Sequence, residues 1–512
     1  MCRRKPHPCS FSMREELMQR HTNTLRIILL VLVGASASAS AQTETNLHSF
    51  GSQPNDGVSP EGITQGADGN FYGTTSLGGT HNSGTVFRIS ASGVYTSLYS
   101  FIGYPSDGQV PVAGLVQGTN GYFYGTTEFG GASDFAGTVF RISPSGAYTS
   151  LYSFAGYPDG FYPNGLVQGS DGNLYGTTID GGTSTNCPEG CGTAFRVTPN
   201  GSEKILYSFQ GFPNDGKAPF AGLVQGSDGN FYGTTGYGFN GTNFSITVVG
   251  SFVLTNGYGS IFRISPSGVY TSLYSFGTNA ASGRIPQNTL VQGSDGNFYG
   301  VTGQGGTNGY GALFRISPSG TFTTLWQFGG IPNDGEGPEG QLVQGSDGNI
   351  YGTTYQGGTN GLIDGGYGTV FRISPSGVYT TVYSFAGPPN DGRIGWGITQ
   401  GTDGNFYGLT SYGGSSGSGT VFRLAVPLNP APWPINQITQ LNVSGTNIVY
   451  AIPSIAGETY QLQYRSAMTS GNWSNVPGVS VTNSIGALMT LTNFGGASQP
   501  QGQGFYRFAI TP

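Results

Sequence analysis

One short pattern, QG-[STA]-[DN]-G-x-x-Y-G, occurs seven times and constrains the fold of this 512-residue chain more than any other feature. A Phe-Arg pair also occurs seven times, and sequences close to LYSF occur six times, with a related LHSF at residues 47–50. The motif tyrosines lie 51 to 67 residues apart: Tyr72, Tyr124, Tyr175, Tyr232, Tyr299, Tyr351 and Tyr407. Self-similarity at such a period is typical of propellers, solenoids and arrays.

Each unit contains four short runs with the composition of β-strands, of the types GLVQG, NFYGTT, TVFRIS and VYTSLYSF. Asp-Gly separates the first two runs and Pro-Ser-Gly separates the last two, and both are tight-turn sequences. No run after residue 41 shows helical periodicity. The sequence therefore predicts an all-β protein of four-stranded units.

The two ends of the repeat array complement each other. The last unit ends at FRLAV without a fourth strand, whereas LHSF precedes the first unit as an unmatched fourth strand. If the N-terminal strand joins the last unit, the chain forms a seven-bladed β-propeller that has no open sheet edge. An open array of β-sheets is the alternative.

The units resemble the GloVer-type tandem repeats of exported bacterial proteins. The resemblance covers about residues 46–425 and rests on GSDGNFYGTT, GGTxxxGTVFRISPSG and LYSF. It implies a secreted or surface-displayed repeat protein, and it brings no catalytic residues with it.

Four segments are expected. Residues 1–41 read as a signal peptide, with basic residues before the apolar run LRIILLVLVG and cleavage after Ala41; a retained membrane anchor is the alternative. Residues 42–426 form the propeller, and PLNPAPWP at 427–434 is a stiff linker. Residues 435–512 contain short strand-like runs and are expected to form a small β-sandwich. The mature chain is then exported, to the exterior, the cell surface or the periplasm, with no membrane span.

Charge and cysteine content limit the partners. Without residues 1–41 the chain holds 13 basic and 23 acidic residues, a net charge of −10, which disfavours nucleic acid. Cys187 and Cys191, in NCPEGCG, are expected to form a local disulfide. No metal site or cofactor is expected, because a zinc site needs ligands that this segment lacks.

Antiparallel order predicts which face varies. The turns between the first and second strands, and between the third and fourth, are short and nearly constant. The other connections differ in length, and in unit 4 the insertion FSITVVGSFVL suggests an added hairpin. Aromatic residues of these connections are the candidate ligand-binding residues, because such rings stack on sugars: Tyr104, Tyr157, Tyr162, Tyr237, Tyr258, Tyr310, Tyr355, Tyr367 and Trp396, with Phe161 and Phe212 beside them. The alternative is that these rings pack between blades.

Repeated charged residues are interpreted as structural. Turn chemistry explains the Asp-Gly aspartates better than calcium binding does. The Phe-Arg arginines are expected to pair with aspartates or backbone carbonyls: Arg88, Arg141, Arg196, Arg263, Arg315, Arg372 and Arg423.

No catalytic motif is present, and the only weak catalytic candidates are the non-repeated carboxylates Glu128, Asp134, Asp180 and Glu336. The leading hypothesis is a non-catalytic protein that binds polysaccharide or another surface partner. A structural or adhesive surface protein and a carbohydrate-active enzyme are the alternatives. The sequence does not indicate an oligomeric state.

Overall fold

The computed structural model describes residues 43–426, except 134, 212–214, 239–245, 250–251, 256–257, 278–279, 332–333, 361–364 and 390. It also describes the backbone of six strands between residues 440 and 511. Residues 42–426 form one compact unit, and residues 427–512 belong to a second. The expected signal peptide and the expected linker lie outside the described residues.

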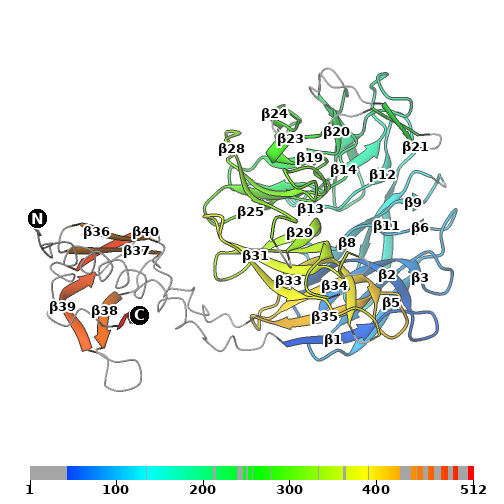
Figure 1. Cartoon of the computed structure of the whole chain (residues 1–512). Helices are drawn as coiled ribbons and strands as arrows, with labels where there is room; N and C mark the ends of the chain where they lie inside the picture. Colours follow the sequence, from blue (N-terminus) through cyan, green and yellow to red (C-terminus); the bar gives the residue numbers. More distant parts are fainter. Residues whose placement is uncertain are drawn as a thin grey trace, which may run out of the picture. The chain divides into compact units, whose positions relative to one another are not determined.

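The described part of the repeat region is a seven-bladed β-propeller whose sheets surround a common centre (Figure 1). All strand pairs within the blades are antiparallel. Within each blade, apart from the outermost strand of blade 7, the strands follow one another along the chain from the centre of the ring outwards. Blade 1 contains β2 (Gly57–Gln65), β3 (Phe71–Gly78), β4 (Thr85–Ile89) and β5 (Tyr95–Ser100). Blade 2 contains β7 (Val116–Gln117), β8 (Phe123–Thr127), β10 (Thr138–Ile142) and β11 (Tyr148–Ser153). Blade 3 contains β12 (Phe161–Pro163), β13 (Val167–Gln168), β14 (Leu174–Asp180), β15 (Thr193–Val197) and β16 (Glu203–Ser208).

The other four blades repeat this plan. Blade 4 contains β18 (Val224–Gln225), β19 (Phe231–Thr235), β23 (Ser260–Ile264) and β24 (Tyr270–Ser275). Blade 5 contains β25 (Val291–Gln292), β26 (Phe298–Thr302), β27 (Ala312–Ile316) and β28 (Phe322–Gln327). Blade 6 contains β29 (Gly335–Gln344), β30 (Ile350–Gly357), β31 (Thr369–Ile373) and β32 (Tyr379–Ser384). Blade 7 contains β33 (Gly392–Gln400), β34 (Phe406–Gly413) and β35 (Thr420–Ala425).

The outer strand of blade 7 comes from the other end of the propeller. Strand β1 (Thr43–Ser49) pairs antiparallel with β35, from Thr43 opposite Ala425 to Ser49 opposite Thr420. In Figure 1 the blue β1 lies beside β35. Blade 7 thereby has four strands like its neighbours.

Stacked rings hold neighbouring blades together. Tyr72 of blade 1 stacks on Phe123 of blade 2 with ring centroids 4.0 Å apart, and Tyr407 of blade 7 stacks on Phe71 of blade 1 at 3.9 Å. These rings are fully buried. Such pairs contribute roughly 0.5–1.5 kcal/mol beyond the area they bury. The hydrophobic core therefore lies between the sheets, as a series of similar layers around the ring.

A ring of glutamines also joins the blades, and the sequence analysis did not identify it. The side-chain oxygen of Gln117 accepts a hydrogen bond from the backbone N–H of Ala67 in the preceding blade, at 2.8 Å. The side-chain amide of the same residue donates to Gly121 of its own Asx-Gly turn. Equivalent contacts to a preceding blade are made by the other glutamines of the QG motif: Gln65, Gln168, Gln225, Gln292, Gln344 and Gln400.

Additional elements extend the connections of blades 2 and 4. Strand β6 (Gly108–Gln109) pairs with β9 (Phe129–Gly130), and β17 (Gly216–Lys217) pairs with β20 (Tyr237–Gly238). The hairpin expected in unit 4 is present as β21 (Ile246–Val249) and β22 (Phe252–Thr255). A short 3₁₀ turn, η1 (Ala280–Ser282), follows β24. No helix in the described part of the chain has the length and apolar character that crossing a membrane requires.

The C-terminal unit contains two three-stranded antiparallel sheets. One has β37 (Asn447–Pro453) between β36 (Gln440–Ser444) and β40 (Leu488–Asn493). The other has β38 (Thr459–Arg465) between β39 (Ser474–Val481) and β41 (Phe505–Thr511).

Candidate functional site

The repeated aspartates accept hydrogen bonds from residues of their own turns. Asp68 accepts hydrogen bonds from the backbone and side-chain N–H groups of Asn70 and from the Tyr72 hydroxyl, at 2.8 to 3.1 Å. Burial is the largest single influence on the pKa of Asp68 and raises it, but these hydrogen bonds together outweigh burial and hold the pKa below its usual value. Turn chemistry therefore accounts for these residues. No group of three His, Cys, Asp or Glu suited to a metal occurs among the described residues.

The repeated arginines lie beside the same tyrosines. Arg88 on β4 is directly opposite Tyr72 on β3, and each of the other six blades repeats this register. Burial, together with the nearby Asp68 carboxylate, raises the pKa of Tyr72 to about 12, and the Arg88 charge partly opposes this. The Arg315 guanidinium donates to the Pro375 carbonyl at 3.2 Å. All seven arginines are half-buried at this register position, and the Nε atoms of Arg141 and Arg196 are buried without a hydrogen-bond partner among the described residues.

Exposed aromatic side chains occur on one face only in the described part of the propeller. Antiparallel order places the connections between second and third strands, and those between blades, at the same end of every sheet. We call this end the variable face. Every large aromatic side chain that is exposed lies there: Tyr104, Phe135, Tyr157, Tyr310, Tyr355 and Tyr412. The opposite turns expose only Val94, Val269 and Val378 among large hydrophobic side chains.

Tyr104 and Tyr157 are the most exposed of the candidate residues, at 52% and 53%. They occupy equivalent places in the connections from blade 1 to blade 2 and from blade 2 to blade 3, three residues after the buried Phe101 and Phe154. Adjacent blades thus present the same ring at the same place. Phe212, the equivalent residue in the next connection, lies outside the described residues.

Tyr258, Tyr310 and Tyr367 share a different repeat position, immediately before the glycine that precedes the third strand. Each ring covers a glycine of the following connection: Gly277, Gly329 and Gly387. A Cβ on any of these glycines would come within 2.2–2.7 Å of a ring atom. Tyr258 and Tyr367 are half-buried by this packing, whereas Tyr310 remains 44% exposed. The alternative interpretation, internal packing, therefore describes Tyr258 and Tyr367 better than ligand contact does.

Tyr162 lies on β12, Tyr237 on β20 opposite Lys217 of β17, and Trp396 within β33, and all three are half-buried. Tyr162 meets Phe129 edge to face, with ring centroids 5.4 Å apart. The Lys217 ammonium lies over the Tyr237 ring, 5.9 Å from its centroid.

A backbone position with positive φ recurs near the start of the innermost strand in all seven blades. Six residues other than glycine, and Gly337 in blade 6, have φ between 50° and 63°: Ser59, Val110, Tyr162, Ala218, Ile285 and Ile394. Val110, Ile285 and Ile394 are β-branched, and for such residues this conformation is a rare and costly one. Val110, for example, is held by its N–H donating to the Ser83 carbonyl of the preceding blade at 3.0 Å. No sequence signal marked these positions, since β-branched residues ordinarily indicate extended strand.

The side chains two residues further along vary in chemistry although their backbone frame is constant. They are Glu61, Val112, Asn164, Phe220, Gln287, Glu339 and Trp396. Asn164 is buried and its amide donates to the Pro219 carbonyl at 2.7 Å, whereas the other six side chains are half-buried or exposed. The sequence analysis selected only Trp396 from this set.

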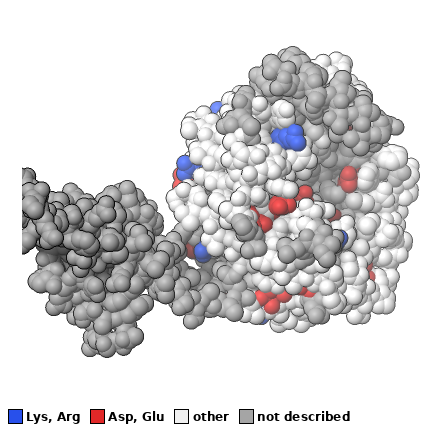
Figure 2. Space-filling model, viewed as in Figure 1, with Lys and Arg blue, Asp and Glu red and all other residues white. Residues whose placement is uncertain are grey.

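Carboxylates from blades 1 to 3 influence one another on the variable face. Burial raises the pKa of Glu61 to about 7, and the negative charge of Glu128 contributes. Burial and Glu189 raise the pKa of Asp180 to about 6, while Lys217 opposes them. Figure 2 shows acidic atoms near the middle of the visible face of the propeller and few basic ones.

The weak catalytic candidates are only partly brought together. Glu128 lies within electrostatic reach of Glu61, and both Glu128 and Asp180 influence the Tyr162 hydroxyl. Glu336 belongs to blade 6, where burial and Asp334 raise its pKa. Asp134 lies outside the described residues.

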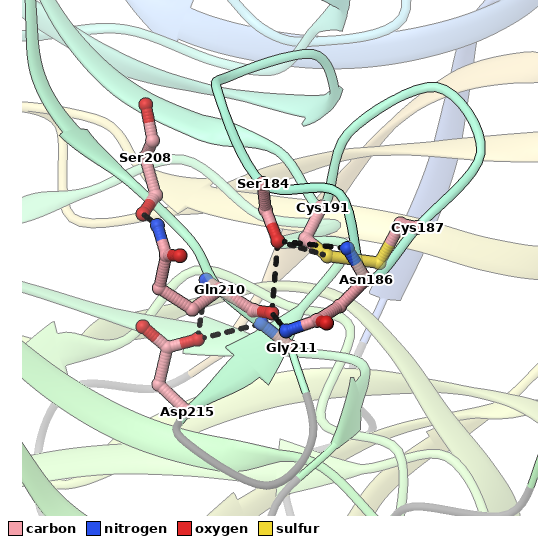
Figure 3. Close-up of a disulfide and its surroundings, with 8 residues drawn as sticks. All are labelled: Ser184, Asn186, Cys187, Cys191, Ser208, Gln210, Gly211 and Asp215. Atoms are coloured by element: carbon pink, nitrogen blue, oxygen red, sulfur yellow. Dashed lines mark hydrogen bonds between the residues drawn. A yellow bond between two sulfur atoms is a disulfide. The ribbon is translucent and has the colours of Figure 1, made fainter.

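The predicted disulfide is present between Cys187 and Cys191 (Figure 3). It lies in the long connection of blade 3, and the nearby Asn186 and Ser184 side chains both donate to the Gln210 carbonyl, at 2.8 and 3.0 Å. Asp215 in turn accepts from the backbone N–H groups of Gln210 and Gly211. The disulfide loop is thus fastened to the connection that leads into blade 4.

Comparison with known proteins gives one sequence match and several structural ones. The sequence model of the Gloeobacter/Verrucomicrobia repeat matches residues 36–247 and 240–430. No curated protein matches the chain.

The similar solved structures include two extracellular domains of hybrid two-component systems from B. thetaiotaomicron. They are 10% and 11% identical to this chain, each with a TM-score of 0.47; the matches cover 89% and 92% of this chain and 53% and 59% of those chains. The chain therefore spans little more than half the length of these proteins. A gluconolactonase from Xanthomonas campestris is 11% identical, with a TM-score of 0.39, over 77% of this chain and 94% of that one.

Proposed function

Because the chain belongs to the Gloeobacter/Verrucomicrobia repeat family, we propose that it is an exported, non-catalytic binding protein whose variable face holds a polysaccharide or another surface partner. The observation that carries this proposal is the segregation of exposed aromatic side chains. Among the described residues, all six exposed rings lie on the face where the units differ, and none lies on the face where they are alike. Rings held by a rigid scaffold stack on the apolar faces of sugars at a small entropic cost.

The remaining parts of the chain fit this role. We propose residues 1–41 as the export signal, 427–434 as a linker and 435–512 as a β-sandwich module. The pairing of β1 with β35 is proposed to close the ring, as the unmatched fourth strand in the sequence implies. A closed ring leaves no sheet edge to pair with other chains.

Binding of the full chain to a panel of soluble and insoluble polysaccharides tests the proposal. The double variant Tyr104→Ala/Tyr157→Ala removes two equivalent rings from adjacent blades. We expect it to weaken binding by about tenfold or more, since a stacked ring contributes on the order of 1 kcal/mol or more. The matched control is Val94→Ala/Val269→Ala, which removes two exposed side chains from the opposite face.

Two results would contradict the proposal. If no glycan is retained, the structural or adhesive alternative is favoured. If both double variants bind as the unaltered chain does, the aromatic residues of the variable face are not the site.

A carbohydrate-active enzyme is the second candidate, and the Glu61 and Glu128 pair favours it. A carboxyl group whose pKa lies near 7 can serve as a general acid at neutral pH, beside a second carboxylate. Product analysis of each glycan mixture separates the two candidates. Shortened chains that disappear in Glu61→Gln and Glu128→Gln indicate catalysis, whereas retention without shortened chains indicates binding alone.

A further inference from the structure

Aromatic rings join the outer strands of most neighbouring blades. In blade 1 the fifth residue of β5, Tyr99, stacks on the first residue of β11, Tyr148, with centroids 4.2 Å apart. Tyr207 stacks on Tyr270 in the same way at 4.4 Å. The connection between the blades adds an aspartate that accepts from the ring hydroxyl, such as Asp107 from Tyr99. These junctions use neutral rings at both positions.

Strand β1 replaces both rings with ionisable side chains. Aligned on the LYSF motif, Glu44 occupies the first position and His48 the fifth. His48 stacks on Tyr95 of blade 1, with centroids 3.8 Å apart, and its Nε2 lies 3.1 Å from the Asp56 carboxylate. Burial acts to raise the pKa of Asp56, but the hydrogen bond and charge of His48, together with the nearby Tyr95 hydroxyl and the Gly57 N–H, hold it below its usual value. The junction towards blade 1 is therefore stabilised by the stack of His48 on Tyr95 and by the contact of His48 with the Asp56 carboxylate.

Glu44 faces the opposite junction, towards blade 6. Its Oε1 is buried and has no hydrogen-bond partner. The groups that influence it, or that it influences, are Asp391 in the connection before β33 and Tyr383 on β32. Asp391 already accepts hydrogen bonds from the Tyr383 hydroxyl and from the Ala386 and Gly392 N–H groups.

The neighbouring strand supplies no cation to this side of the sheet. Glu44 pairs opposite Leu424, whereas Arg423 pairs opposite Thr45 and therefore points to the other side. The Arg423 guanidinium lies beside Tyr407 instead. An ionised Glu44 would thus face a second carboxylate in a half-buried site.

We propose that β1 is a pH-dependent latch, which seats in blade 7 while Glu44 carries its proton and loosens when Glu44 ionises opposite Asp391. Strand β1 is separated from β35 along the chain by the whole ring. It is held in blade 7 by strand pairing and by contacts at its C-terminal end, such as the Ser415 N–H on the Ser49 hydroxyl, with no turn that joins it to β35. Strand β16 has a glutamate, Glu203, at the equivalent position, but a short turn at residues 198–202 ties it to β15. Of these two strands, only β1 can therefore separate from its neighbour when the glutamate ionises.

The direction of the effect follows from linkage. Burial and Asp391 raise the pKa of Glu44 from 4.5 to about 8, so the seated state binds the proton more tightly than the released state does. Stabilisation by the protonated form is complete below pH 4.5 and is lost as the pH rises through 8. Asp56 acts in the opposite direction: its stabilisation is present above the pKa of a free aspartate and is lost as the pH falls. Seating is thus firmest in mildly acidic solution.

Hydrogen–deuterium exchange of the full chain between pH 5 and 9, corrected for intrinsic rates, tests the latch. We expect protection of residues 43–49 to fall by as much as about tenfold per pH unit up to pH 8. Strand β24, which has Tyr270 at the equivalent position, serves as the internal reference and should keep its protection. Glu44→Gln should remove the pH dependence of β1, and Glu203→Gln should leave it unchanged.

A pH-independent β1 in the unaltered chain, or an unchanged slope in Glu44→Gln, would overturn the proposal. If Glu44→Gln does not fold, Glu44→Tyr is the second variant. It introduces the residue type that Tyr95 and Tyr148 provide at the equivalent position of β5 and β11, and it is expected to give the same pH-independent protection. His48→Tyr is expected to leave the alkaline loss in place, because that loss originates at the other junction. If His48→Tyr abolishes the loss of β1 protection at alkaline pH, His48 and not Glu44 is the titrating residue, and the proposal is wrong.

Discussion

The side-chain oxygen of Gln65 accepts a hydrogen bond from the backbone N–H of Thr402 at 2.8 Å, although the two residues are 337 positions apart. The same contact joins each of the other six pairs of neighbouring blades, so the first and last blades meet as any other two do. The stack of Phe71 on Tyr407 lies at the same junction. The junction between blades 7 and 1 thus has the glutamine contact and the inner ring stack that occur at other junctions.

Gln65→Ala is expected to lower the free energy of unfolding by about 1 kcal/mol, because it leaves the Thr402 N–H without its protein partner. Gln225→Ala, which breaks the same contact between blades 3 and 4, is the matched control and should cost a similar amount. Guanidinium denaturation measures both. If Gln65→Ala has no effect while Gln225→Ala destabilises, the ring is not held together at the junction of blades 7 and 1.

Tyr258→Ala and Tyr104→Ala should separate packing from surface exposure. Tyr258 covers Gly277 and packs against the core of blades 4 and 5, so its loss is expected to cost about 2 kcal/mol or more. Tyr104 is 52% exposed, and its loss should change the unfolding free energy by less than about 0.5 kcal/mol. Thermal unfolding of the two variants checks this order, and a reversed order would contradict the assignment of their roles.

The disulfide is expected to stabilise one connection rather than the whole propeller. Because Cys187 and Cys191 close a very short loop, chain entropy predicts a loss of about 2 kcal/mol in Cys187→Ala/Cys191→Ala. Hydrogen exchange should increase mainly around residues 182–191 and in the neighbouring segment around Gln210, whose carbonyl accepts from Ser184 and Asn186. Exchange that rises equally in all blades would show that the disulfide acts globally.

Glu203 should make stability depend on pH at a position remote from β1. Burial, together with Asp159, raises its pKa from 4.5 to about 7, and its Oε1 is buried without a partner. The contribution of its protonated form is complete below pH 4.5 and is lost as the pH rises through 7. Glu203→Gln should therefore become increasingly more stable than the unaltered chain across this range, as measured by denaturation at a series of pH values. A constant difference would show that Glu203 does not titrate in this range.

The number of units, their strands and the position of the variable connections could all be predicted from the repeated motifs. Repetition made this possible: seven copies of Asp-Gly, Phe-Arg and the motif tyrosine reveal the turns and the buried ring of each blade. The added hairpin at residues 246–255 and the disulfide of Cys187 and Cys191 were predicted for the same local reason, since turn chemistry and close spacing suffice.

Which candidate rings face solvent could not be predicted from the motifs, because it depends on the folded structure. Tyr104 and Tyr258 look alike in the sequence, but one is exposed and the other covers a glycine of a neighbouring connection. The glutamine contacts between blades, the positive φ of Val110 and the meeting of Glu44 with Asp391 were equally hidden. Each depends on groups that come together when the blades pack around the ring, and local propensity contains no information about such distant neighbours.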